Sequence, residues 1–350
     1  MSDFSPRILI ASVQVPFTRG GAEVLVDRLS SALKATGALV DIVQLPFTAI
    51  PKESLLKSIG YWRSLDLTSF NGLPVDLVIC TKFPSYLINH PRKITWLIHQ
   101  YRQIYDLYGT RFGDLSTADN DEALRQLLTK VDLTALNECQ KLFTISDNVT
   151  KRLDKYCGLR AATIVPPLPL AGRYYQSNYL PYILSVGRIC SIKRIDMIIC
   201  AMANIDERLT LKVVGTADEA QIENYIKSEI DKHHLARRIE FLGNVSDEKL
   251  LELYAQAFIT YYAPFDEDLG FVTLESLASG TPVITCSDSG GSLAFIENEV
   301  NGLITEPNDI ALAAAINSLL DDKCIYENLR REAKLPITTD WQTVVNKLLC

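Results

Sequence analysis

Two glutamates, Glu267 and Glu275, lie eight positions apart in the segment 265–284. The pattern of this segment predicts the end of a strand, a turn, a short helix and a second strand. Because the free amide groups at the start of a helix attract anions, a phosphate could bind between the two carboxylates. One carboxylate would then face a phosphate-linked group and the other would accept hydrogen bonds from hydroxyl groups, which suits a nucleotide-sugar. The candidate phosphate ligands are Gly270, Phe271 and Val272.

A second group of candidate residues follows the apolar run that ends at Gly187. Arg188 and Lys193 come after this run, five positions apart, in a segment that opens a helix. Fixed positive charge at the carboxyl end of a strand is where a diphosphate needs it, both for binding and for its stabilisation as a leaving group. This position favours a diphosphate site over a pair of solvated surface cations.

The turn after the first apolar run is a third candidate, since Gly20 and Gly21 precede a helix there. Two glycines let backbone amides approach an anion closely, although a glycine pair alone would equally suit a plain turn. The chain has no Gly-x-Gly-x-x-Gly segment, and therefore lacks the dinucleotide fingerprint. This absence disfavours an NAD-dependent oxidoreductase.

The elements that must position these residues alternate along the chain. Apolar runs alternate with helical periods, which predicts an α/β fold with parallel sheets. Three prolines within 166–169 interrupt the pattern, because proline continues neither a helix nor a central strand. We therefore expect two Rossmann-like domains, 1–168 and 169–335, with a C-terminal helix near 336–350 that packs back on the first. Ligands of open parallel sheets bind at the carboxyl ends of the strands, so an interdomain cleft is expected to hold the site.

The individual elements follow from the same periodicities. The expected strands are 7–13, 40–45, 76–81, 94–99, 141–145, 182–186, 209–215, 239–242, 258–262 and 282–286. The expected helices are 22–35, 119–139, 147–156, 194–202, 218–233, 247–256, 309–321 and 340–349, in addition to the short helix after Gly270.

Taken together, the three segments resemble the retaining nucleotide-sugar glycosyltransferases of family 4, and the resemblance covers essentially the whole chain. These enzymes have the GT-B fold of two facing Rossmann-like domains, with a Glu-x7-Glu motif in the second. The resemblance implies that Glu267 contacts the donor sugar at the reaction centre and that Glu275 binds the ribose hydroxyls. The residues that it implies for the diphosphate include Arg188, Lys193, Gly20 and Gly21.

Further candidate residues lie outside these motifs. His99, at the end of a predicted strand, matches a histidine that lies beside the donor hexose in the family. The segment 101–114 is rich in Tyr and Arg; its rings could stack on an acceptor sugar, although helix packing would explain them as well. The residues expected near the nucleotide base are Gly215, Asn244 and Val245.

Two acidic triplets, 119–121 and 266–268, fit the Asp-x-Asp pattern by which other sugar transferases bind Mn²⁺ or Mg²⁺. The first precedes a helical run, where acidic side chains cap the helix start. The second overlaps the Glu-x7-Glu motif, and the resemblance implies that cationic side chains and helix amides act there instead of a metal. We therefore expect no metal requirement and no cofactor, with the nucleotide-sugar as a co-substrate.

The composition of the chain restricts its binding partners, its location and the state of its cysteines. The net charge of −7 argues against a duplex nucleic-acid partner. The first 170 residues are mildly basic, which would allow a weak peripheral contact with anionic lipid. No apolar run reaches the roughly 18 residues needed to span a bilayer, and no secretion signal is recognisable, which favours the cytoplasm, with any membrane contact at its inner face. The eight cysteines include no Cys-x-x-Cys pair and are expected as free thiols.

The function that best fits these observations is the transfer of a hexose, with retention, from a nucleotide-diphosphate sugar to a glycan or lipid-linked glycan in polysaccharide or cell-envelope biosynthesis. UDP-glucose or a similar UDP-hexose is the preferred donor and GDP-mannose the second, and a monomer or dimer is expected. Two alternatives stay open: a sugar-nucleotide epimerase on the same fold, and a non-catalytic nucleotide-sugar-binding protein.

Overall fold

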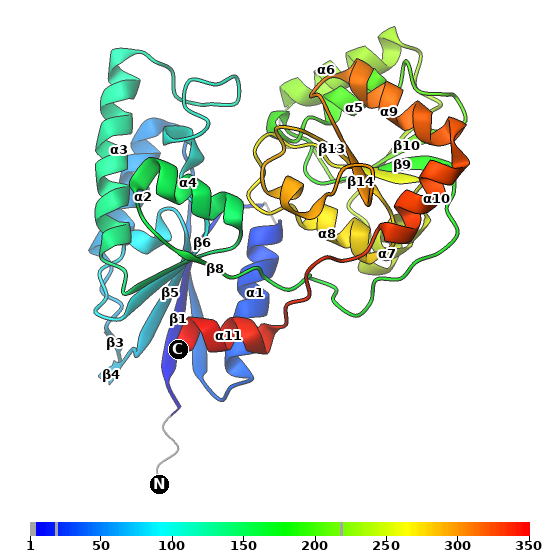
Figure 1. The fold of residues 1–350 in the computed structure, drawn as a ribbon. Helices are drawn as coiled ribbons and strands as arrows, with labels where there is room; N and C mark the ends of the chain where they lie inside the picture. Colours follow the sequence, from blue (N-terminus) through cyan, green and yellow to red (C-terminus); the bar gives the residue numbers. More distant parts are fainter. Residues whose placement is uncertain (1–4, 18–19, 218–219) are drawn as a thin grey trace. The chain divides into compact units, whose positions relative to one another are not determined.

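The computed structural model describes residues 5–17, 20–217 and 220–350. The chain folds into two compact units (Figure 1). The first runs to Pro169 and also contains Thr339–Cys350, and the second spans Leu170–Thr338. Among the described residues, no helix combines the length and the apolar character that crossing a membrane requires.

The first unit contains a six-stranded sheet in the order β2-β1-β5-β6-β7-β8, in which every neighbouring pair is parallel. Because β2 and β5 flank β1, the loops that follow β1 and β5 leave the carboxyl edge in opposite directions. Open α/β sheets bind ligands at the point where the strand order reverses in this way. The strands are β1 (Arg7–Gln14), β2 (Leu39–Pro46), β5 (Leu77–Lys82), β6 (Lys93–His99), β7 (Lys141–Thr144) and β8 (Ala162–Thr163), with a separate hairpin of β3 (Ser69–Phe70) and β4 (Leu73–Pro74).

The helices of this unit are α1 (Gly21–Lys34), α2 (Lys52–Ser64), α3 (Asp119–Asn137), α4 (Asp147–Cys157) and α11 (Trp341–Leu349), with short 3₁₀ turns η1 (Ser85–Leu87) and η2 (Arg102–Ile104). The C-terminal helix α11 packs against α1, as Figure 1 shows. The ring of Trp341 lies edge-on to the fully buried Trp96 of β6, with centroids 6.3 Å apart. This aromatic contact attaches the last residues of the chain to its first unit.

The second unit repeats the architecture, with a parallel sheet in the order β11-β10-β9-β12-β13-β14. Here β9 is the strand at which the order reverses, so the loops after β9 and β12 are neighbours at the carboxyl edge. The strands are β9 (Tyr182–Val186), β10 (Thr210–Val214), β11 (Ile239–Gly243), β12 (Ile259–Tyr261), β13 (Val283–Cys286) and β14 (Gly302–Thr305).

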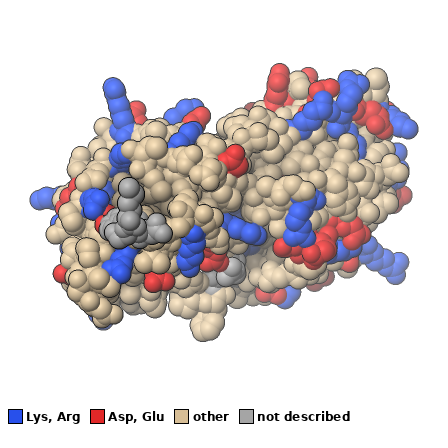
Figure 2. All heavy atoms as spheres, turned by 90° about the horizontal axis from the view of Figure 1, so that it is seen from below, with Lys and Arg blue, Asp and Glu red and all other residues tan. Residues whose placement is uncertain are grey.

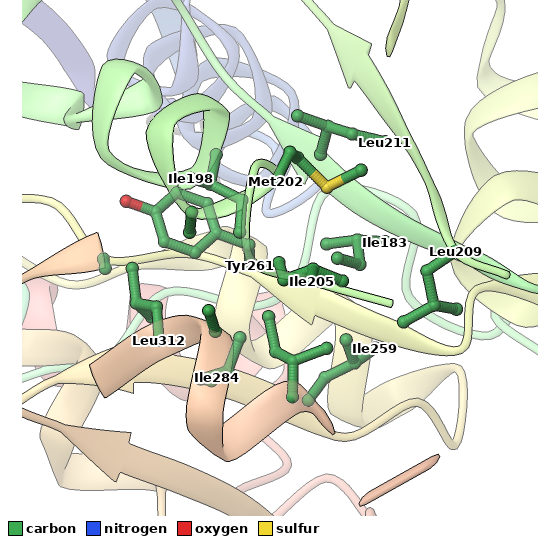
Figure 3. Packing of buried hydrophobic residues seen from close by; sticks show 14 of the residues in the cluster. Ile183, Ile198, Met202, Ile205, Leu209, Leu211, Ile259, Tyr261, Ile284 and Leu312 are labelled. Carbon is green, nitrogen blue, oxygen red and sulfur yellow. The ribbon is translucent and has the colours of Figure 1, made fainter. Parts of the chain in front are cut away.

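The helices of the second unit are α5 (Ile195–Ala201), α6 (Ala220–Lys232), α7 (Asp247–Gln256), α8 (Phe271–Ala278), α9 (Asp309–Asp321) and α10 (Lys323–Glu332), with 3₁₀ turns η3 (Ser191–Lys193) and η4 (Gly291–Phe295). The main core lies between the sheet and the α5, α6 and α9 helices. Figure 3 shows Ile183 and Ile259 of the central strands packed among Ile198 of α5 and Leu312 of α9. The expected start of α6, Asp218, lies outside the described residues.

On the face drawn in Figure 2, Lys and Arg side chains lie scattered among Asp and Glu side chains. This distribution fits the net charge of −7. It differs from the clustered basic face of proteins that bind a nucleic-acid backbone.

Candidate active site

The start of α8 is an open helix N-terminus. Gly270 caps it with φ 88° and ψ 60°, a left-handed conformation that favours glycine. A Cβ at this position would also lie 2.5 Å from the Ser292 hydroxyl. As a glycine, the cap offers no side-chain acceptor to the first amides of the helix, and the first turn carries no acidic residue. The first amides of α8, at Phe271 and Val272, therefore receive no side-chain cap from Gly270 and stay the predicted candidates for binding an anion.

An ion pair joins two of the predicted site residues. The Lys193 ammonium donates to Glu267 Oε2 across 74 positions of sequence, and also to the Tyr262 hydroxyl at 3.0 Å. Both side chains of the pair are mostly buried, at 17% and 18% exposure. Burial by itself lowers the pKa of Lys193, but the charge of Glu267, together with Tyr262 and the hydrogen bonds to both residues, leaves that pKa raised. The lysine is thus held as a cation beside Glu267, which precedes the Gly270 cap of α8 by three residues.

Arg188 lies on the loop that carries Lys193. The loop begins at Gly187, at the carboxyl end of β9, and Arg188 is exposed on it. The carbonyl of Gly187 is so close to Gly215 that a Cβ there would lie 2.0 Å from it. Close packing between the ends of β9 and β10 therefore accounts for glycine at 215.

Glu275 lies on α8, buried at 8% exposure. Its Oε2 accepts from the Tyr254 hydroxyl at 2.8 Å and its Oε1 from the Tyr174 hydroxyl at 3.3 Å. Burial raises the pKa of Glu275, against the two tyrosine hydrogen bonds, which lower it. No sequence motif marks either tyrosine, and they come from α7 and from the segment that opens the second unit. The arrangement provides an oriented carboxylate that can accept further hydrogen bonds.

The residues predicted near the base follow β10 and β11. Gly215 and Gly243 form a bridge at the ends of these strands. Asn244, directly after β11, is exposed. Val245 is half-buried and packs on the small cluster around Tyr182 and Tyr254. All the candidates of the second unit therefore follow the carboxyl ends of its parallel strands.

In the first unit, the glycine turn is tied to a buried ion pair that sequence reasoning missed. The Gly20 amide donates to Glu23 Oε2 at 2.9 Å, and the Lys82 ammonium donates to Glu23 Oε1 at 2.8 Å. Burial raises the pKa of Glu23, but the charge and hydrogen bond of Lys82, together with backbone hydrogen bonds from Gly20 and Glu23, leave that pKa below its ordinary value. Neither Gly20 nor Gly21 has a positive φ, so the backbone there does not itself require glycine.

Replacing Lys82 with methionine should destabilise the protein in a pH-dependent way. Removing one partner of a buried pair costs about 3–5 kcal/mol. In the wild type, the lowered pKa of Glu23 contributes stability that is present above the ordinary glutamate pKa and is lost as the pH falls through the folded pKa. In the variant, the unpaired carboxylate destabilises at neutral pH and is relieved by protonation. The difference in Tm should thus be largest near pH 7 and shrink toward about pH 4.

Thermal unfolding across this pH range measures the effect. Lys57→Met is the control, because Lys57 is exposed on α2 in the same unit and its loss should leave Tm within about 1–2 °C. Glu23→Gln added to Lys82→Met should recover part of the lost stability at neutral pH. A Tm difference that stays constant with pH would contradict this account of the pair.

His99 lies at the end of β6, half-buried, with Nδ1 2.8 Å from the carbonyl of Gln100. The following aromatic residues are packed inside the unit. Tyr101 is 9% exposed and stacks on Phe83, and the hydroxyl of the buried Tyr105 donates to Asp132 at 2.7 Å. In this part of the segment 101–114, packing accounts for the rings, and they do not present open faces to an acceptor sugar.

The described residues contain no group of three or more His, Cys, Asp or Glu side chains that could hold a metal ion. In the first acidic triplet, Asp121 pairs with Lys52 and accepts from the Ser116 amide at 2.8 Å. The predicted capping role was wrong in detail: the N-cap of α3 is Ala118, without a side-chain cap hydrogen bond, and the acidic residues occupy the first turn of the helix, where their charge is favourable. In the second triplet, Glu267 is the partner of Lys193.

Comparisons of the chain with known proteins identify relatives of its sequence and fold. The family model described as glycosyl transferases group 1 matches residues 177–335. A D-inositol 3-phosphate glycosyltransferase from Corynebacterium glutamicum is 30% identical over 313 residues, 81% of this chain and 73% of that protein. A glycogen synthase from Mycobacterium tuberculosis is 26% identical over 271 residues, 74% of this chain, and the match spans only 65% of that enzyme.

A solved structure shows the same fold over the whole chain. HepE of Anabaena, crystallised with UDP-glucose, superposes with a TM-score of 0.69 at 17% identity, covering 98% of each chain. The expected α/β fold with two parallel sheets is confirmed. The chain belongs to the group 1 glycosyltransferases, as the resemblance to family 4 implied.

Proposed function

We propose that the protein transfers a hexose, with retention, from a nucleotide-diphosphate sugar to a glycan or lipid-linked glycan in polysaccharide or cell-envelope biosynthesis. A UDP-hexose such as UDP-glucose is the preferred donor, and GDP-mannose the second choice. The observation that carries the proposal is the mostly buried Lys193–Glu267 pair, whose glutamate precedes the Gly270 cap of α8 by three residues. Family membership supports the reaction class, and the UDP-glucose complex of HepE supports the choice of base.

The roles follow from the charges that form during the reaction. Breaking the sugar–phosphate bond builds positive charge on the anomeric carbon and negative charge on the departing diphosphate. In the proposal, Lys193, Arg188 and the amides of Phe271 and Val272 stabilise the diphosphate. Glu267 faces the donor sugar and Glu275 accepts from the ribose hydroxyls. The acceptor attacks from the face that the diphosphate leaves, without a metal ion or cofactor.

The first unit supplies the remaining groups in this proposal. Gly20 and Gly21 approach the phosphates, and His99 lies beside the hexose. Gly215, Asn244 and Val245 of the second unit surround the base. We place the reaction in the cytoplasm, in a monomer or dimer, with a weak peripheral contact to anionic lipid through the mildly basic first 170 residues.

Two measurements test the proposal. Thermal-shift screening of UDP, GDP, ADP and NAD should identify the base, because a ligand at 100 times its Kd stabilises by about 2.7 kcal/mol. Labelled sugars linked to the nucleotide that stabilises the protein in this screen should then be transferred to an acceptor glycan at a rate unchanged by EDTA. Interconversion of free sugar nucleotides without acceptor would support the epimerase instead, and donor binding without either reaction would leave a binding protein.

A further inference from the structure

Arg194, which follows Lys193, is a buried residue whose side chain links several loops at the carboxyl edge of the second sheet. Its side chain is 3% exposed. The guanidinium makes a two-pronged contact with Asp288, with Nη2 at 2.7 Å from Oδ1 and Nη1 at 2.8 Å from Oδ2. It also donates to the carbonyls of Ala263 at 2.6 Å and Pro264 at 3.0 Å. The planar fork of arginine suits this set of acceptors, and lysine would not reproduce it.

These contacts join three loops that follow β9, β12 and β13, here called the β9 loop (187–194), the β12 loop (262–270) and the β13 loop (287–291). Lys193 belongs to the β9 loop and Glu267 to the β12 loop. Backbone hydrogen bonds continue the connection, from Phe265 to Ile192 at 2.9 Å, from Asp266 to Asp288 at 2.9 Å and from Glu267 to Ser289 at 3.2 Å. The Arg194 guanidinium lies where all three loops meet.

The backbone of Arg194 is itself unfavourable. Its φ of 53° and ψ of 39° are left-handed, which costs a residue with a side chain about 1–2 kcal/mol. Glycine would adopt this conformation without that cost. The hydrogen bonds of the guanidinium, and the bond that the Tyr261 hydroxyl donates to the Arg194 carbonyl at 2.7 Å, hold the residue in place. The local structure at Arg194 therefore depends on its side chain.

We infer that Arg194, together with Asp288, is a positioning residue for hexose transfer: it fixes the β9 loop against the β12 loop and so sets the Lys193 ammonium relative to the Glu267 carboxylate. The inference rests on the proposed function. Arg194 does not contact the donor, because its guanidinium is buried and its charge is paired with Asp288. Its loss should thus affect the chemical step more than nucleotide binding, since Glu275 is oriented by Tyr254 and Tyr174, which lie outside the three loops.

The test uses Arg194→Gly, which removes the guanidinium and keeps a residue suited to the left-handed backbone. The value of kcat should fall about 10²-fold, the loss that a misplacement of about 1 Å produces. The Kd for UDP, or for whichever nucleoside diphosphate the wild type binds, should change less than about threefold, under 0.7 kcal/mol. Added guanidinium ion should restore part of kcat by filling the vacated position beside Asp288. Arg194→Lys, which keeps the charge without the fork, should lose nearly as much.

Arg238 provides the matched control. Its guanidinium also bonds to backbone carbonyls of the second unit, those of Met202, Ile205, Asp206 and Leu209, which lie between α5 and β10 and away from the three loops. Arg238→Ala should lower Tm and leave the kcat of the folded protein unchanged. If Arg194→Gly, Arg194→Lys and Asp288→Asn keep the wild-type kcat, or lose no more than Arg238→Ala, the inference is wrong while the transferase proposal stands. A wild type that transfers no hexose overturns both.

Discussion

Replacing Lys193 with alanine should lower kcat for hexose transfer by about 10²- to 10³-fold, the loss typical of removing one group that stabilises developing charge. The ammonium is mostly buried, and the charge of Glu267 holds it protonated. Charge interactions are stronger in such a site than in water, and negative charge builds on the diphosphate as it departs. The Lys193 ammonium should therefore stabilise mainly the departing diphosphate. The loss should therefore appear in kcat more than in KM.

Steady-state kinetics with the donor identified by the nucleotide screen measure this loss. Lys212→Ala is the control, because Lys212 belongs to β10 of the same unit and pairs with Glu240 at 3.5 Å; it removes an equal charge and should leave kcat unchanged. Arg188→Ala, which removes an exposed cation, should cost less than Lys193→Ala. Equal kcat in the wild type and Lys193→Ala, with both folded, would rule out this role for the lysine.

Much of the second unit could be predicted because its elements have strong local patterns. The expected strand 182–186 and helices 247–256 and 309–321 coincide with β9, α7 and α9. The helix α10 was missed although its sequence is strongly amphipathic, whereas two other missed elements have weak patterns. In α2 only Leu55, Ser58 and Trp62 are buried, which is too few for a clear helical period. The strand β14 has four residues and begins with a glycine, so that its sequence is typical of a turn.

In the site, too, local sequence patterns predict some features and miss others. Cations and carboxylates after predicted strands could be assigned to one edge of a sheet, since the carboxyl ends of parallel strands meet there. Their partners could not be predicted. Tyr174 lies 101 positions from Glu275, and Arg194 lies 94 positions from Asp288. Such contacts depend on tertiary packing, which no local period encodes. The same holds for the Lys82–Glu23 pair, whose members each look like an ordinary surface charge in the sequence.

The carboxylate of Glu275 gives the second large expected effect. Glu275→Gln should weaken nucleoside diphosphate binding about 10- to 100-fold, because each hydrogen bond to a charged acceptor contributes about 1.5–3 kcal/mol. The value of kcat at saturating donor should change little, since the ribose contact is the same in the ground and transition states. Isothermal titration with the nucleotide found in the screen measures the Kd. The Kd of the Lys212→Ala variant should match that of the wild type.

The pH dependence of binding distinguishes the charge of Glu275 from its shape. Burial raises the pKa of Glu275, so the carboxylate takes up a proton at a higher pH than an ordinary glutamate and then loses acceptor capacity. Wild-type affinity should therefore fall on acidification before an ordinary glutamate would titrate, whereas Glu275→Gln should show no such fall. Tyr254→Phe removes a hydrogen bond that favours the ionised form, and should move the fall to still higher pH. Parallel pH profiles for the wild type and Glu275→Gln would show that the ribose hydroxyls bind elsewhere.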